Sequence, residues 1–297
     1  GLVGSEMCIR DSLIEHLSKR KLGNKDYPAD LMGDAYEILL KKFADDSKAQ
    51  AGEFYTPRSV VRLLVHILDP QPGETVYDPA CGSGGMLIEA IRYMHDDSLC
   101  CGSIFGQEKN VVNAAIAKMN LFLHGASDFN VMQGDTLRDP KILQGGNIAK
   151  FDCVIANPPF SLENWGATEW SSDKYKRNIY GTPSDSCGDY AWIQHMICSM
   201  SSGKGRMAVV MPQGILFRGN QEAEIRKQLV ESDLIEAVVT LGDKLFYGTG
   251  LSPCFLIIRR MKQAHHSGRI LMIDGSKILT QKRAQNILEE NDIDRLY

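Results

Sequence analysis

The apolar positions of this chain form short runs that alternate with segments of helical period. The runs have the length of β-strands and occupy residues 75–77, 103–106, 129–132, 151–156, 206–211, 234–241, 254–259 and 270–273. The segments with helical spacing occupy residues 56–68, 86–93, 110–124, 189–200 and 221–231. Strands and helices in alternation predict a doubly wound α/β fold with a mostly parallel sheet, which binds ligands at the carboxyl ends of its strands.

The first fifty residues have a different pattern. Residues 12–19 and 30–43 are amphipathic with a helical period, so we expect a partial helical region before the sheet. Residues 1–12 have no clear period and resemble a translated sequencing-adapter remnant, so we treat them as a non-native leader. The expected division is a leader at 1–12, helices at 13–50, the α/β domain at 51–280 and the start of a truncated helical tail at 281–297.

Composition narrows the class of protein. Hydrophobic residues make up 43% of the chain and charged residues 24%, as in ordinary globular proteins. No apolar run reaches the ~18 residues of a membrane helix, and the N-terminus lacks the pattern of a secretion signal. The eight cysteines include no C-x-x-C pair, and no metal-ligand spacing occurs. We therefore expect a soluble cytoplasmic protein with reduced thiols, no membrane contact and no metal.

The net charge of −4 bears on the choice of partners. A protein that binds DNA by itself usually has a basic face, because neutralised phosphates supply most of the non-specific affinity. The chain has no strong basic run. If its substrate is a nucleic acid, we expect another subunit or a missing segment to supply much of the affinity.

A glycine-rich turn at residues 78–85 follows the first apolar run and opens a helix. Its glycines allow a ligand to approach the backbone closely, next to the free N–H groups of a helix N-terminus. Glu108 lies 24 residues after Gly84, close to the ~20-residue offset of an acid that binds a ribose. Together they indicate a nucleoside cofactor, but a nicotinamide or flavin fold, or a tight turn with a surface acid, has the same features.

The stretch Asn157-Pro158-Pro159-Phe160 follows the run at 151–156. Neither proline donates a hydrogen bond or continues a strand, so a stiff turn fixes the directions of the Asn157 amide and the Phe160 ring. An acceptor beside a flat ring suits a planar group that carries an NH2. The alternative is an ordinary proline turn after a strand.

Several blocks in a fixed order resemble the S-adenosylmethionine-dependent amino-methyltransferases, in particular the modification (methylase) subunit of type I restriction-modification systems. The resemblance runs from about residue 30 to the C-terminus, and its blocks are residues 52–58, 78–86, 107–108, 134–136 and 157–160. Phe160 stands where a Tyr is often found, and both rings stack. Such subunits usually have longer helical regions at both ends, so this chain is similar to a fragment of one.

The resemblance implies S-adenosylmethionine as the cofactor and assigns roles around it. Glu108 would accept hydrogen bonds from the ribose hydroxyls, Asp135 would face the adenine, and Asp78 would support the turn. The remaining cofactor residues, most of them walls around the methionine part, would be Glu53, Phe54, Tyr55, Thr56, Pro57, Arg58, Ala80, Gly82, Ser83, Gly84, Gly85 and Thr136.

It also implies how the target base is held. The Asn157 side-chain oxygen and the Pro158 carbonyl would accept the two hydrogens of an exocyclic amine, and Phe160 would stack on the flipped base. Phe246, between two strand-like runs, stands where the family has a second stacking ring; the alternative is that Phe246 is a core residue.

The implied function is N6 methylation of adenine in double-stranded DNA. The implied partners are a separate DNA-specificity subunit, a second copy of this chain and a restriction (nuclease/translocase) subunit. Two alternatives stay open. Methylation of a protein glutamine or of an RNA base uses similar Asn-Pro-Pro blocks, and an inactive cofactor-binding or assembly module has the same fold. The blocks at residues 53–58 and 242–251 favour DNA.

Overall fold

A computed structural model describes residues 36, 38, 56–94, 102–246, 252–282 and 285–297. The expected leader and nearly all of the expected N-terminal helical region lie outside these residues. Of that region only Tyr36 and Ile38 are described, and both are helical.

The centre of the fold is an eight-stranded sheet with the order β10-β8-β9-β7-β6-β1-β2-β3. Strand β9 runs antiparallel to β7 and β8, and the other neighbouring pairs are parallel. The strands are β1 Val76–Asp78, β2 Ile104–Glu108, β3 Phe129–Gln133, β6 Cys153–Ala156, β7 Arg206–Pro212, β8 Ile235–Leu241, β9 Pro253–Arg259 and β10 Leu271–Gly275. The prediction of a doubly wound, mostly parallel α/β sheet is confirmed.

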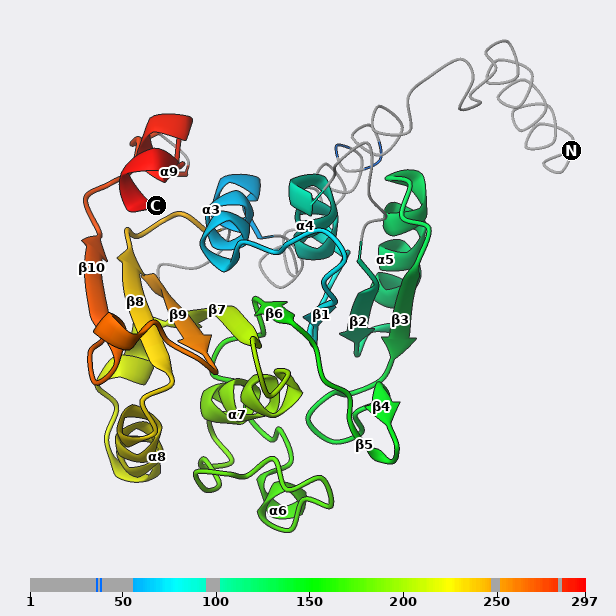
Figure 1. Ribbon diagram of the computed structural model, residues 1–297, viewed down its shortest axis with the longest axis vertical. Helices are drawn as coiled ribbons and strands as arrows, with labels where there is room; N and C mark the ends of the chain where they lie inside the picture. The colour runs from blue at the N-terminus through cyan, green and yellow to red at the C-terminus, as the bar shows by residue number, and fades with distance from the viewer. Residues whose placement is uncertain (1–35, 37, 39–55, 95–101, 247–251, 283–284) are drawn as a thin grey trace, which may run out of the picture.

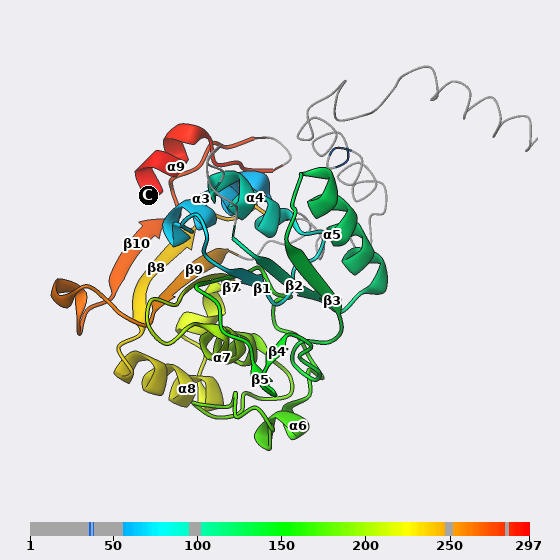
Figure 2. The same ribbon diagram turned by 45° about the vertical axis from the view of Figure 1, so that its right-hand side comes forward.

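Helices cover both faces of the sheet, as Figures 1 and 2 show. One face has α3 Arg58–Leu68, α4 Gly85–Met94, α5 Val111–Leu123 and α9 Glu290–Leu296. The other has α7 Asp189–Ser199 and α8 Asn220–Glu231. Shorter elements connect them: the hairpin β4 Leu143–Gln144 and β5 Asn147–Ile148, the helix α6 Ala167–Ser171, and the 3-10 helices η2 Gln213–Leu216 and η3 Ala264–His266.

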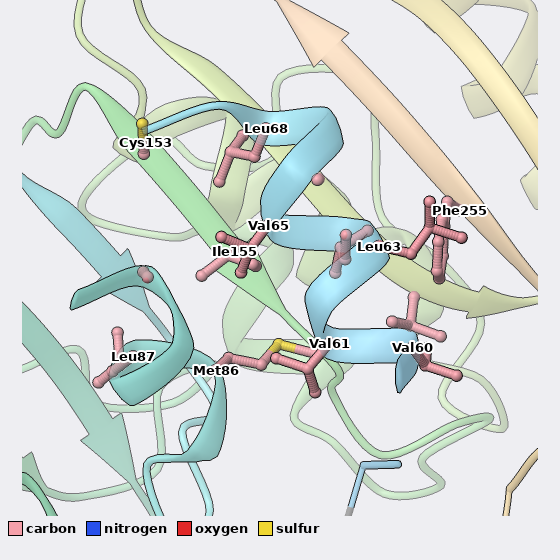
Figure 3. Packing of buried hydrophobic residues seen from close by; sticks show 14 of the residues in the cluster. Val60, Val61, Leu63, Val65, Leu68, Met86, Leu87, Cys153, Ile155 and Phe255 are labelled. Carbon is pink, nitrogen blue, oxygen red and sulfur yellow. The ribbon is translucent and has the colours of Figure 1, made fainter. Parts of the chain in front are cut away.

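Two hydrophobic clusters, one on each face, hold the layers together. Side chains of a strand alternate between its faces, so Ile155 of β6 belongs to the cluster under α3 and Val154 to the cluster under α7. In Figure 3, Val65 of α3 lies beside Ile155, and Val61 lies beside Met86 of α4. Because both faces are buried, the central strands read as continuous apolar runs.

The start of α3 differs from a simple capping pattern, in which Thr56 caps the helix and Pro57 is its first residue. The helix begins at Arg58, and Pro57 is the N-cap with an extended ψ of 131°. The Pro57 carbonyl accepts from the N–H groups of Val60 at 2.9 Å and Val61 at 3.1 Å. The Thr56 hydroxyl makes no capping bond to this helix and accepts instead from the side chain of Asn157.

Candidate active site

The glycine turn lies between β1 and α4 and is fixed by buried hydrogen bonds. Asp78, 2% exposed, accepts the Ala80 N–H at 2.9 Å. Gly82 and Gly84 have φ of 53° and 86°, a left-handed conformation that glycine adopts without a Cβ penalty. A Cβ at Gly85 would meet no atom within 4 Å, so there is open space beside the start of α4.

Burial changes the acidity of Asp78. Loss of water raises the pKa of this carboxyl to about 8, the Ala80 N–H opposes the rise, and the charge of Glu108 adds to it. A carboxyl with such a pKa is largely protonated near neutral pH. Asp78 therefore supports the turn without adding a full negative charge below the cofactor residues.

Glu108, at the end of β2, stands between the turn and the next helix. One carboxylate oxygen accepts the Gly82 N–H at 3.0 Å, and the other accepts the Asn110 N–H at 2.7 Å. Asn110 in turn caps α5, accepting from the N–H groups of Val112 and Asn113. The carboxylate is thus fixed in direction at the carboxyl edge of the sheet.

Asp135 and Thr136 follow β3 at the same edge. The Thr136 hydroxyl donates to the Pro79 carbonyl at 2.6 Å and so joins this loop to the glycine turn. One Asp135 oxygen accepts the N–H groups of Leu137 at 3.2 Å and Arg138 at 3.3 Å. The other is 3.0 Å from the Lys109 ammonium, which is 72% exposed. The Asp135 carboxylate therefore fixes the backbone of the loop that follows β3, at the carboxyl edge of the sheet.

A buried arginine also binds the backbone carbonyls of this loop. Arg177, 1% exposed, donates to the carbonyls of Thr136 at 2.8 Å and Leu137 at 2.7 Å. Its charge is matched by Asp173 at 2.8 Å, and its guanidinium lies over the Trp170 ring at 4.4 Å. Local sequence patterns did not indicate this residue, because its partners lie about forty positions away.

The side chain of Asn157 is the most distinctive feature of the site. Its Nδ2 donates to the Thr56 hydroxyl at 2.9 Å. Its Oδ1 is buried and has no hydrogen-bond partner among the residues that the structure describes. An unpaired buried carbonyl oxygen is costly, on the order of 1–3 kcal/mol, so it marks a place where a donor from outside is expected.

Two aromatic rings from distant parts of the chain meet next to Asn157. The centroids of Phe160 and Phe246 are 6.3 Å apart, and the ring planes are inclined by 58°. Phe160 is half-buried, whereas Phe246 is 7% exposed and belongs to the hydrophobic core. In this structure Phe246 therefore fits the core alternative and backs the ring of Phe160.

The turn that holds Asn157 is fastened after Phe160. Pro158 is buried, and Ser161 has a φ of 50° and donates its N–H to the Asp189 carboxylate at 2.7 Å. Asp189 is 1% exposed and stands in the first turn of α7. Reasoning from the sequence missed this residue; the available signal was an acid at a helix N-terminus, where the helix dipole favours one.

The structure brings most of the predicted residues to one edge. Glu53, Phe54 and Tyr55 lie outside the described residues. Arg58 is exposed in the first turn of α3, and its Nε is 3.9 Å from a Glu89 carboxylate oxygen. Hydrogen bonds and ring contacts at this edge involve Thr56, Asp78, Ala80, Gly82, Glu108, Thr136, Asn157 and Phe160 with Phe246.

Comparison with known proteins decides the family. The family model described as N-6 DNA Methylase matches residues 28–297. The chain belongs to the N-6 DNA methylase family. It is 37% identical to the type I restriction enzyme MjaVII methylase subunit of Methanocaldococcus jannaschii, over 100% of this chain and 52% of that protein. The chain thus spans about half the length of the curated relatives it matches.

Solved structures agree with this N-6 DNA methylase assignment. A type I restriction-modification methyltransferase subunit from Streptococcus thermophilus is 31% identical and superposes with a TM-score of 0.84 over 95% of this chain and 59% of that one. A putative class I S-adenosylmethionine-dependent methyltransferase from Listeria monocytogenes, 17% identical, shares the fold with a TM-score of 0.67 over 86% of this chain and 76% of that one.

The described part of the chain lacks two further features. None of its helices is both long and apolar enough to cross a membrane. Within the same residues, no three His, Cys, Asp or Glu side chains gather in a group that could hold a metal ion.

Proposed function

We propose that this chain is the catalytic part of a type I modification subunit. It transfers the methyl group of S-adenosylmethionine to the N6 amine of adenine in double-stranded DNA. Membership of the N-6 DNA methylase family and similarity to methylase subunits of type I restriction enzymes support the substrate.

One observation carries the proposal: the buried Oδ1 of Asn157, which has no partner among the described residues and stands three positions before Phe160. Its Nδ2 is held by Thr56, so the oxygen is presented to the site and the amide is not free to turn. The exocyclic amine of adenine is a donor of the right kind. Its lone pair is delocalised into the ring, so unassisted it is a poor nucleophile.

The chemistry follows from two acceptors placed on that amine. The Asn157 oxygen and the Pro158 carbonyl accept its two hydrogens and favour a pyramidal nitrogen, whose lone pair is then free. That lone pair would be directed at the methyl group that bound S-adenosylmethionine supplies, and the methylated amine would lose its extra proton to water. Phe160, backed by Phe246, stacks on the flipped base.

The residues present fit S-adenosylmethionine, which supplies an electrophilic methyl group when bound. The turn at Gly82 to Gly85 has left-handed glycines and open space beside it, as a close approach of ligand to backbone requires. Glu108 would hold the ribose hydroxyls, Asp135 would face the adenine, and Asp78 would support the turn. The walls around the methionine part would come from residues 53–58 and from Ser83, with Ala80 and Thr136 beside them.

Partners complete the proposed activity. The net charge of −4 supports a separate specificity subunit that supplies affinity for DNA and reads its sequence. A second copy of this chain and a restriction subunit would join the full complex, in the cytoplasm. A related structure, solved to explain complex assembly in a type I system, is 28% identical with a TM-score of 0.70 over 89% of this chain, which supports such an assembly.

The product of the reaction tests the proposal against its alternatives. The chain, assembled with the specificity subunit, is incubated with tritiated S-adenosylmethionine and either duplex DNA, structured RNA or a glutamine-containing release-factor domain. We expect label in DNA, recovered as N6-methyladenine after digestion to nucleosides. Label only in RNA or protein would contradict the proposal, and cofactor binding without any transfer would favour an inactive module.

A further inference from the structure

An exposed aromatic residue lies at the same edge of the sheet as residues 157–160, which we call the target-base turn. Phe217 is 74% exposed and directly follows η2, the 3-10 helix after β7. Strands β6 and β7 pair in parallel, with Ala156 opposite Val209, so the segments that follow them leave the sheet at the same edge. The ring of Phe217 thus lies on the edge where Asn157 and Phe160 stand.

Ion pairs and hydrogen bonds fix the backbone on both sides of the exposed Phe217 ring. Arg218 pairs with the carboxylates of Asp189 and Glu222, which are 1% and 6% exposed. Arg226 donates to the carbonyl of Arg218 at 2.9 Å and to that of Ile215 at 3.1 Å. Buried ion pairs with several hydrogen bonds hold one geometry and resist rearrangement.

The same carboxylate joins this segment to the target-base turn. One oxygen of Asp189 accepts the Ser161 N–H at 2.7 Å, directly after Phe160, and the other pairs with Arg218, directly after Phe217. The two aromatic residues are therefore held in register through a single buried group. Arg218 is occupied by two carboxylates, so this segment presents an apolar ring to its surroundings.

We propose that Phe217 enters the DNA duplex at the target base pair and stabilises the flipped adenine, an inference that rests on the proposed function. Flipping a base costs a few kcal/mol in lost stacking and pairing and leaves a gap in the helix. Phe is among the apolar side chains that proteins insert between base steps. The ring of Phe217 stacks on the bases that border the gap, while Phe160 stacks on the base that has left it.

The test compares Phe217→Ala with the control Phe122→Ala. Phe122 is 68% exposed and so matches Phe217 in residue type and exposure, but it lies on α5, which packs against β2 and β3. Both variants and the wild type, assembled with the specificity subunit, methylate a fully paired duplex and a duplex with an abasic site opposite the target. Fluorescence of 2-aminopurine at the target position reports flipping directly.

We expect Phe217→Ala to slow single-turnover methylation of the paired duplex by about tenfold or more and to lose most of the 2-aminopurine signal. The loss should shrink on the abasic duplex, where flipping costs less, and Phe122→Ala should behave as wild type. A wild-type rate on the paired duplex, or an equal loss on both duplexes, overturns the inference and leaves the proposed function standing. Failure of the wild type to methylate any DNA overturns both.

Discussion

The amino ends and the carboxyl ends of the parallel strands differ in how their buried polar groups are paired. At the amino ends, Glu74 accepts from Arg206 at 2.6 and 3.2 Å and from the Gln71 N–H at 2.9 Å, and Lys204 lies 3.2 Å away. Burial alone would raise the pKa of Glu74, but the Arg206 and Gln71 hydrogen bonds outweigh it and lower the pKa to about 2.

At the carboxyl ends, buried polar groups have fewer hydrogen-bond and ion-pair partners. Burial raises the pKa of Asp78 to about 8, and the Asn157 oxygen has no partner in the part of the chain that the structure describes. These groups cost stability in the free protein. The amino ends therefore pair their buried charges, whereas the carboxyl ends leave buried polar atoms with few partners, as is common at functional sites.

The largest effect on stability is expected at the amino ends. Arg206 also donates to the Leu68 carbonyl at 2.6 Å. Arg206→Met therefore removes the guanidinium from the buried Glu74 carboxylate, which keeps only the Gln71 N–H and Lys204, and removes the donor to the Leu68 carbonyl at the end of α3. Breaking a buried pair in this way costs about 3–5 kcal/mol. Urea denaturation of wild type and variant measures the change in the free energy of unfolding.

The matched control is Arg259→Met, at the end of β9. Its pair with Glu236 is more open, with side chains 29% and 18% exposed, so the expected loss is at most about 1 kcal/mol. Equal losses in the free energy of unfolding for the two variants would show that the cluster around Glu74 and Arg206 stabilises the protein no more than an exposed ion pair does.

A smaller effect, with a defined pH dependence, is expected from Asp78→Asn. The folded pKa of Asp78 is raised, so the folded protein binds a proton that the unfolded chain releases. The contribution of this group to stability is full below its ordinary pKa of 3.8 and is lost as the pH rises toward about 8. The variant keeps an oxygen for the Ala80 N–H and removes the titration.

Unfolding free energies of wild type and Asp78→Asn, measured across this range, isolate the contribution of the carboxyl. The wild type should lose stability relative to the variant as the pH rises toward 8. A difference between the two proteins that does not change with pH would contradict the account of the carboxyl edge.

Local patterns in the sequence were enough to predict the eight strands of the main sheet, most helices and the glycine turn, but not the hairpin of β4 and β5. A central strand such as β6 is an uninterrupted apolar run because both faces are buried, and a turn such as that at Gly82 needs glycine whatever surrounds it. Acids at the ends of strands, such as Glu108, could be found because parallel strands present them at one edge.

Residues fixed by long-range contacts could not be predicted in this way. Thr56 reaches Asn157 across 101 positions, and no pattern near Thr56 indicates that its hydroxyl makes this contact while the helix begins at Arg58. Arg177 and Asp189 lie in or after the irregular segment between β6 and α7, where no period indicates which carbonyl or N–H they meet. Only the folded structure brings these partners together.

The orientation of the Asn157 amide is the central claim, and single-turnover methyl transfer to adenine in a cognate duplex tests it most directly. Asn157→Ala, assembled with its specificity subunit, should bind cofactor and DNA nearly as wild type and transfer the methyl group on the order of 10²-fold more slowly. Thr56→Val, which frees the amide to turn, should slow transfer by up to about tenfold. A wild-type transfer rate for Asn157→Ala would show that the proline turn is only structural and would contradict the account.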